Sequence, residues 1–157
     1  MITIEKHSGI YTLQVRQELP ISLEDAWEFF SLPANLSKIT PAEMKFEITS
    51  GNSNKIYQGQ IISYRISPFA GLNMNWVTEI TSVVENHLFV DEQRYGPYKM
   101  WHHEHHFEET SNGTLIMDKV SYKLPFGIIG HWTHKLFIKK QLFRIFNFRY
   151  YTLHDIF

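Results

Sequence analysis

Four histidines lie close together in the segment MWHHEHHF, which runs from Met100 to Phe107. Imidazole rings at this spacing can bind a metal ion, transfer protons or hydrogen-bond a ligand in a pocket. Because side chains alternate along a β-strand, a strand here would divide the histidines into two pairs on opposite faces. His103 and His105 would share a face with Trp101 and Phe107, two large rings that favour burial. We therefore expect this inner pair to point into the protein.

An aspartate on the following segment is the predicted partner of the inner pair. Alternation along TLIMDKVSYK places Asp118 on the same face as Ile116 and Val120, which is the apolar face. A buried carboxylate needs a partner, because without one its pKa must rise. We expect His103 or His105 to be that partner. Three hypotheses stay open for this cluster: contact with a ligand, a structural network that fixes the strand register, and general acid–base catalysis.

The other face of the segment carries an outer set of polar residues, which are His102, Glu104 and His106. Histidines two residues apart on a strand can share a metal ion, with the carboxylate between them as a further ligand. This face should lie on the convex, solvent-exposed side of the sheet, where no cavity excludes water. We therefore interpret the outer set as a solvated face, and we expect neither a metal nor a cofactor in this protein.

Composition sets bounds on the class of protein. A chain of 157 residues is long enough for one domain, residues 1–157, with a sizeable core. Aromatic residues make up 15% of it, which indicates a core or a cavity wall built from rings. A net charge of -1 argues against a nucleic-acid partner, and no apolar run approaches the roughly 20 residues of a membrane span. The lack of cysteine excludes disulfides and thiolate metal sites, and the cytoplasm is the expected location.

The elements that must position these residues follow a simple order along the chain. Residues 11–19, YTLQVRQEL, alternate as a half-buried strand. The capping pattern of Ser22 and Asp25 predicts that a helix begins there, and a second helical turn is expected at residues 34–38. Residues 43–124 have the pattern of about six successive strands. Because the turns between them are short, these strands should pair antiparallel.

One long helix is predicted from Ile128 to His154, which would be about 40 Å long. A curved sheet needs a cover for its concave face, and this helix is the one predicted element that is large enough. We expect Arg149 on this helix to pair with an acidic residue, Asp91 or Glu92, in preference to a ligand carboxylate. Basic and apolar residues share the remaining sides of the helix, which favours a homodimer face over a surface that touches anionic membranes.

These features together resemble the START-like superfamily, also called SRPBCC or helix-grip, and in particular its small stand-alone bacterial ligand-binding branch. Six segments carry the resemblance over nearly the whole chain: LPISLEDAWEFFSLPANLSKITP from Leu19, WVTEI from Trp76, DEQRYGPY from Asp91, WHHEHHF from Trp101, DKVSYKLPFG from Asp118 and IFNFRY from Ile145. The resemblance implies an α+β fold, in which a curved antiparallel sheet of about seven strands wraps around a long C-terminal helix, with one or two short helices after the first strand. It also implies a hydrophobic cavity between sheet and helix, since members bind lipids, sterols, polyketides or hormones, and some are cyclases, dehydratases or hydroxylase components.

The leading hypothesis is a non-enzymatic binder, transporter or sensor of a small hydrophobic ligand. The alternative is a cyclase- or dehydratase-type enzyme in which His103, His105 and Asp118 transfer protons. A third is a protein-interaction module with a filled core. The predicted ligand-binding residues are Tyr64, Met74, Trp76, Trp101, His103, His105, Asp118, Tyr122, Trp132, Leu136 and Phe143.

Overall fold

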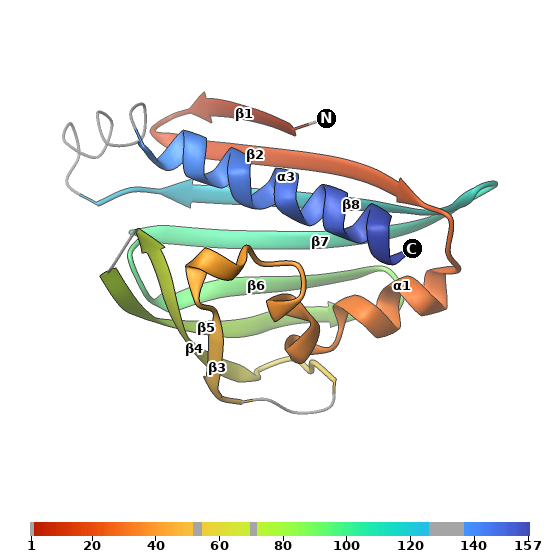
Figure 1. Cartoon of the computed structure of the whole chain (residues 1–157), viewed down its shortest axis with the longest axis horizontal. Coiled ribbons are helices and arrows are strands. Elements are labelled where there is room, and N and C mark those ends of the chain that lie inside the picture. The colour runs from red at the N-terminus through yellow and green to blue at the C-terminus, as the bar shows by residue number, and fades with distance from the viewer. Residues whose placement is uncertain (1, 52–54, 70–71, 126–136) are drawn as a thin grey trace.

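The described part of the chain forms one antiparallel sheet that helices cover on one face (Figure 1). The computed structural model describes residues 2–51, 55–69, 72–125 and 137–157. In these residues, eight strands follow the order β1-β2-β8-β7-β6-β5-β4-β3 across the sheet. The strands are β1 Ile2–His7, β2 Ile10–Leu19, β3 Glu47–Ser50, β4 Ile61–Phe69, β5 Leu72–Val84, β6 Leu88–Tyr95, β7 Met100–Thr110 and β8 Gly113–Lys123.

Three short helices connect β2 to β3. They are α1 Leu23–Phe30, η1 Pro33–Ser37 and η2 Ala42–Met44. Ser22 caps α1, because its hydroxyl accepts a hydrogen bond from the Asp25 N–H at 3.0 Å. The predicted helix start is therefore confirmed, and the helical turn predicted at residues 34–38 corresponds to η1.

The last element, α3 Lys139–Ile156, runs over β2 and β8 (Figure 1). The predicted α+β helix-grip fold is therefore confirmed. The prediction of about seven strands lacked β1, in which Ile2 and Ile4 pair with Val15 and Leu13 of β2. The first part of the predicted long helix, with Trp132 and Leu136, lies outside the described residues. Within the described residues, the helices are all too short or too polar to cross a membrane.

The sequence predicts that this helix faces the sheet with a stripe of Trp132, Leu136, Phe143, Phe146 and Tyr150, and the buried face of α3 agrees with this stripe only in part. Its buried residues are Leu142, Phe146, Arg149 and Leu153. Phe143, which the prediction placed in the buried stripe, is half-buried and lies beside Lys139, whose Nζ is 5.9 Å from the ring centre. Successive helix residues point about 100° apart, so a shift of one position turns a side chain away from the sheet. Phe146 is buried as predicted, whereas Phe143 and Tyr150 are half-buried, and two leucines and an arginine occupy the other buried positions.

Candidate ligand-binding cavity

A cavity of about 430 Å³ lies between the sheet, helix α3 and the short helices that follow β2. Strands β4, β5, β6 and β7 supply the sheet side of its wall, and most of the lining side chains are apolar. The volume falls within the range of about 300–1,000 Å³ that is typical of small-molecule sites. The cavity therefore has the size and character for a small hydrophobic ligand.

Five of the predicted ligand-binding residues line this cavity: Tyr64, Trp76, Trp101, His103 and His105. Asp118 and Tyr122 lie behind the wall, because Asp118 is covered by the histidines and the Tyr122 ring stacks on Tyr11 at 5.5 Å. Met74, near the start of β5, is half-buried and does not belong to the lining, and neither does Phe143. Direct contact of any of these residues with a ligand stays a prediction.

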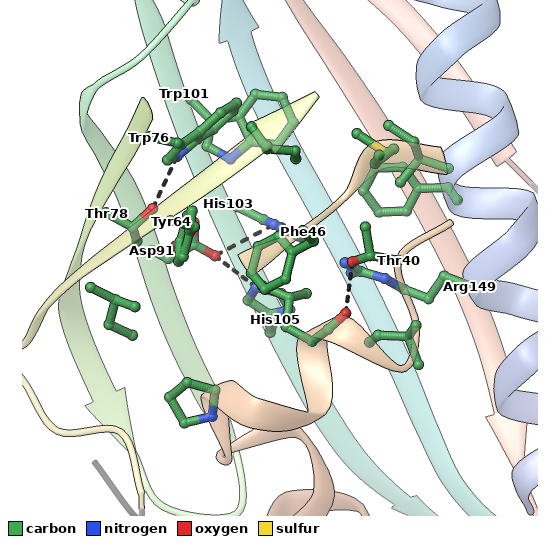
Figure 2. A pocket seen from close by; sticks show the side chains of 18 of the residues that line it. Thr40, Phe46, Tyr64, Trp76, Thr78, Asp91, Trp101, His103, His105 and Arg149 are labelled. Carbon is green, nitrogen blue, oxygen red and sulfur yellow. Dashed lines mark hydrogen bonds and ion pairs between the residues drawn. The ribbon is translucent and has the colours of Figure 1, made fainter. Parts of the chain in front are cut away.

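One part of the cavity wall is aromatic. Trp76 and Trp101 meet edge to face, with their ring centres 5.3 Å apart, and Tyr98 lies 4.7 Å from Trp101. Phe46 and Tyr64 form a further pair at 5.1 Å (Figure 2). Rings in such contacts present broad, rigid apolar surfaces, which suit the body of an aromatic or aliphatic ligand.

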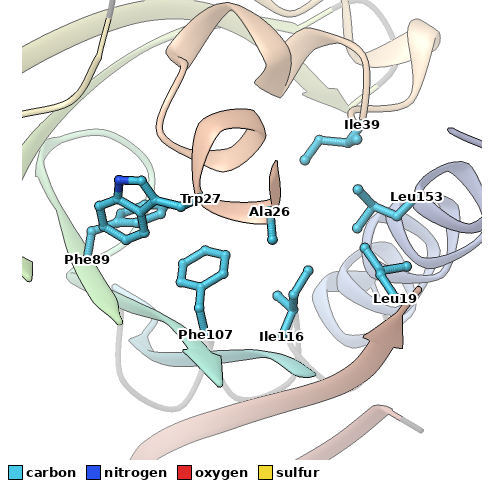
Figure 3. Packing of buried hydrophobic residues seen from close by; sticks show 8 residues of the cluster. All are labelled: Leu19, Ala26, Trp27, Ile39, Phe89, Phe107, Ile116 and Leu153. Atoms are coloured by element: carbon cyan, nitrogen blue, oxygen red, sulfur yellow. The ribbon is translucent and has the colours of Figure 1, made fainter. Parts of the chain in front are cut away.

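The cavity ends on a packed apolar cluster (Figure 3). The cluster consists of Leu19, Ala26, Trp27, Ile39, Phe89, Phe107, Ile116 and Leu153. Trp27 meets Phe89 and Phe107 edge to face, with ring centres 6.0 and 5.5 Å apart. Phe89 and Ile39 also line the cavity, so this cluster closes it at one end. Trp27, which belongs to α1, is therefore part of the core under this helix.

One side of the cavity wall is polar and charged, because five ionisable side chains from four elements meet there. They are Asp91 of β6, His103 and His105 of β7, Asp118 of β8 and Arg149 of α3. Strand pairing brings the first four together, because Asp91 lies opposite His103 and Asp118 lies opposite His105. Figure 2 shows the Asp91 carboxylate facing both imidazole rings, with Arg149 approaching from the helix.

The two inner histidines lie between the two carboxylates. His103 Nε2 is 2.9 Å from Asp118 Oδ1, and its Nδ1 is 3.5 Å from Asp91 Oδ2. His105 Nε2 is 2.9 Å from Asp91 Oδ2; its Nδ1 is 2.9 Å from Asp118 Oδ1 but lacks the alignment of a hydrogen bond. The imidazole rings lie 3.7 Å apart, and Phe89 stacks on His105 at 4.0 Å. The predicted pairing of Asp118 with an inner histidine is confirmed, and it involves both.

Arg149 is the fifth member, and its carboxylate partner differs from the predicted one. Its Nη1 is 3.6 Å from Asp118 Oδ1, and its guanidinium lies over the Phe146 ring at 5.0 Å. Glu92 is excluded as a partner because it follows Asp91 on the strand and points to the other face. Arg149 is only 7% exposed, yet within the described part of the chain its Nε and Nη1 have no hydrogen-bond partner.

The charges of this cluster compensate one another. Burial alone would raise the pKa of Asp118, but its contacts with His103, His105 and Arg149 hold that pKa well below its ordinary value. The pKa of Asp91 is lowered against the effect of burial by the same three residues. Burial alone would lower the pKa of His105, but its contacts with Asp118 and Asp91 raise that pKa. The pKa of His103 is lowered, because burial and the neighbouring His105 both disfavour its charged form. The two carboxylates are therefore stabilised in their charged form by the guanidinium and the two imidazoles.

The outer set lies on the opposite face of β7, as predicted. His102 Nδ1 is 2.8 Å from Glu92 Oε1, and His106 Nε2 is 2.9 Å from Glu104 Oε2. Glu104 also accepts from Lys119 at 2.9 Å. The two histidine side chains are 33% and 35% exposed, so the outer set interacts with water as well as with these partners.

From the sequence, Asp91 and Arg149 were predicted only as possible partners of each other, and neither was predicted to line the cavity. The strand of Asp91 could not be given a buried face, because Phe89 and Val90 are both buried and the alternation is lost there. The pairing of β5 with β6 also contains two register shifts. The signal that could have found Asp91 is its position opposite His103 in an antiparallel pair, which requires the register to be known.

The fold and the cavity together define a small helix-grip protein with an internal space for a ligand. Residues 19–140 match the model of the family described as "Polyketide cyclase / dehydrase and lipid transport". The chain belongs to this family. The resemblance to the START-like superfamily is thus confirmed. A search of curated proteins finds no match to the chain.

Solved structures of other proteins share the fold. A protein from Rhodobacter sphaeroides is 14% identical with a TM-score of 0.71, over 99% of this chain and 97% of that one. A protein from Mycobacterium smegmatis is 15% identical with a TM-score of 0.69, over the full length of both chains. The major latex-like protein 151 of Panax ginseng is 16% identical with a TM-score of 0.58, over 86% of this chain and 96% of that one. At these identities the likeness concerns the fold alone.

Proposed function

We propose that the protein binds a small hydrophobic ligand that carries a polar group at one end. The observation that carries this proposal is the division of the cavity wall. Aromatic and aliphatic side chains make up most of it, whereas Asp91, His103, His105 and Arg149 gather on one side. Apolar walls with a few convergent polar groups are typical of ligand sites, where the polar groups fix the orientation. The family description, which includes lipid transport, supports a ligand of this class.

Displacement of an apolar fluorophore, such as N-phenylnaphthylamine, tests this proposal. Ile66→Phe adds a ring to the cavity wall, and Ile61→Phe places the same ring on the exposed face of the same strand. Because the added ring occupies ligand space, Ile66→Phe should weaken fluorophore binding by about tenfold, which corresponds to about 1.4 kcal/mol. The control should bind like the wild type, and circular dichroism should show that both variants are folded.

Native extraction followed by mass spectrometry would identify the ligand itself. Equal fluorophore binding by both variants, together with a protein that carries no extractable molecule, would contradict the proposal. Oligomeric state, membrane contact and location in the cytoplasm stay predictions. A protein-interaction module with a filled core is the weakest of the three hypotheses, because a filled core would not leave a cavity of about 430 Å³.

An enzyme of the cyclase or dehydratase type is the second candidate function. The observation that favours it is the contact of His103 with Asp118 at 2.9 Å, in which the carboxylate orients an imidazole on the cavity wall. Because the pKa of His103 is lowered, its ring is neutral and can accept a proton. The test is to incubate the extracted ligand with fresh protein. Dehydration would lower the ligand mass by one water and cyclisation would change its NMR spectrum, whereas an unaltered ligand would leave binding as the function.

A further inference from the structure

We propose that Asp91, His103 and His105 form a binding site for a divalent transition-metal ion. Each residue offers one ligand atom, and these atoms all lie within 4.8 Å of one another. Two imidazoles and one carboxylate suit ions such as Zn²⁺, Fe²⁺ or Co²⁺ better than Mg²⁺ or Ca²⁺, which prefer oxygen ligands. No metal was predicted from the sequence, because Asp91 could not be placed beside the inner histidines and the outer histidines lie on a solvated face.

The spacing of the three ligand atoms supports the site. Asp91 Oδ2 is 3.5 Å from His103 Nδ1 and 2.9 Å from His105 Nε2. Atoms that share one ion at 2.0–2.1 Å stand about 2.9 Å apart in an octahedral site and about 3.4 Å apart in a tetrahedral one. The contact with His103 is too long for a good hydrogen bond, yet it fits two ligands of one ion. The two distances to Asp91 thus fit ligands of one ion, and the third, between the two imidazole nitrogens, is no longer than 4.8 Å.

The other nitrogens of the two rings support the same conclusion. His103 Nε2 and His105 Nδ1 are both 2.9 Å from Asp118 Oδ1. Metal-bound histidines typically donate their second N–H to a carboxylate, which fixes the tautomer and the ring orientation. Asp118 accepts from His103 Nε2, so His103 Nδ1 is left without a proton, as a metal ligand requires. His105 Nδ1 lies at the same distance but is not aligned, and a rotation of its ring that allowed it to donate to Asp118 would leave His105 Nε2 free for the ion. Arg149, 3.6 Å from the same oxygen, offsets the charge of Asp118.

The direct contacts of the cluster leave buried polar atoms unsatisfied. Among the residues that the structure describes, His105 Nδ1 and Arg149 Nε and Nη1 have no hydrogen-bond partner, and His105 is only 6% and Arg149 only 7% exposed. Buried polar groups in folded proteins nearly always have partners, so the side chains alone do not complete this arrangement. An ion that draws the two rings toward Asp91, together with an oxygen ligand near Arg149, would complete it.

The ion would face the cavity, because Asp91, His103, His105 and Arg149 are all part of the cavity wall. Three protein ligands leave coordination positions open on that side. Two carboxylates, one guanidinium and a divalent ion give the site a net charge of plus one, so it would favour an anionic oxygen donor, such as a carboxylate or an enolate. This statement about the donor rests on the proposed function, whereas the metal site itself does not.

Titration of the chelator-treated full chain with Co²⁺ alone tests the metal site. We expect one ion per chain by calorimetry and a visible absorption band from the coordinated cobalt. Asp91→Asn, which removes a ligand at equal volume, should abolish the band. Asp118→Asn should weaken affinity by about 10- to 100-fold, since partners of ligand histidines have effects of this size. The matched control is His102→Gln with His106→Gln, which removes the outer histidines and should leave binding unchanged.

The outcome that overturns the proposal is equally specific. Binding that survives Asp91→Asn but disappears in the outer double variant would assign the ion to the convex face. Absence of Co²⁺ and Zn²⁺ binding to the wild type would also overturn the inner site. If Asp91→Asn does not fold, anomalous diffraction from cobalt-loaded wild-type crystals locates the ion directly. The fluorophore assay uses no metal and the metal titration uses no ligand, so failure of one proposal is distinguishable from failure of the other.

Discussion

At the scale of single residues, the molecule depends on a buried aspartate that carries a charge. Asp118 is 5% exposed and contacts both inner histidines and Arg149. Its pKa is held well below its ordinary value, because these contacts outweigh the effect of burial. Removal of its charge would leave the buried Arg149 guanidinium without the carboxylate with which it forms an ion pair. Loss of one partner of such a buried pair is costly, even where the complete pair adds little net stability.

Asp118→Asn should therefore lower the free energy of unfolding by about 3–5 kcal/mol. Urea denaturation followed by circular dichroism measures this change. The matched control is Asp155→Asn, because Asp155 is exposed near the end of α3 and its substitution should change the free energy by about 0.5 kcal/mol or less. Similar values for the two variants would mean that Asp118 does not balance the buried charges.

Alternation along the strands predicted part of this cluster from the sequence. It succeeded for β7 and β8, because these strands pair over their whole length without a register shift. The inner pair and Asp118 were therefore placed correctly on one face. It failed for β6, where Phe89 and Val90 are both buried, and so Asp91 was not assigned to the site. The position of Asp91 depends on the register between two strands, which the residues of one strand do not determine.

At the scale of elements, the rotation of α3 about its own axis decides which side chains meet the sheet. Leu142, Phe146, Arg149 and Leu153 are buried at spacings of four, three and four residues. Arg149 can occupy this stripe because Asp118 compensates its charge. Apolar spacing alone does not place an arginine on a buried face, so the predicted stripe shared Phe146 with the observed one but contained Phe143 in place of Leu142. The order of strands and helices was predictable, since it depends on local patterns, whereas the helix rotation depends on a contact between distant segments.

The two neighbouring residues on α3 offer a direct test of this rotation. Leu142 is 2% exposed and packs in the core, so Leu142→Ala should lower the free energy of unfolding by about 2–5 kcal/mol. Phe143 is half-buried, so Phe143→Ala should cost less than about 1 kcal/mol, although it removes a larger side chain. Alanine favours the helix in both variants, and the difference between them therefore reports burial. A larger loss for Phe143→Ala in chemical denaturation would support the stripe predicted from the sequence.

At the scale of the whole molecule, the sheet and its covering helices do not fill the space between them. The resemblance to a known superfamily predicted a cavity, but its lining depends on how side chains from six or more elements pack, which no local pattern determines. The cavity of about 430 Å³ represents contacts that the protein does not make with itself. A ligand that supplies those contacts binds the native state and not the unfolded chain, so it must stabilise the fold.

The protein should therefore unfold at a higher temperature when a ligand occupies the cavity than when the cavity is empty. A ligand at about 100 times its Kd adds about 2.7 kcal/mol, which for a chain of this length raises Tm by about 5–10 °C. Calorimetry of the delipidated wild type with and without N-phenylnaphthylamine measures the shift. Ile66→Phe, whose added ring takes up cavity space, should show a much smaller shift, and Ile61→Phe should respond like the wild type. Equal shifts in all three proteins would place the bound molecule outside the cavity, because only the inward substitution changes the space that the ligand needs.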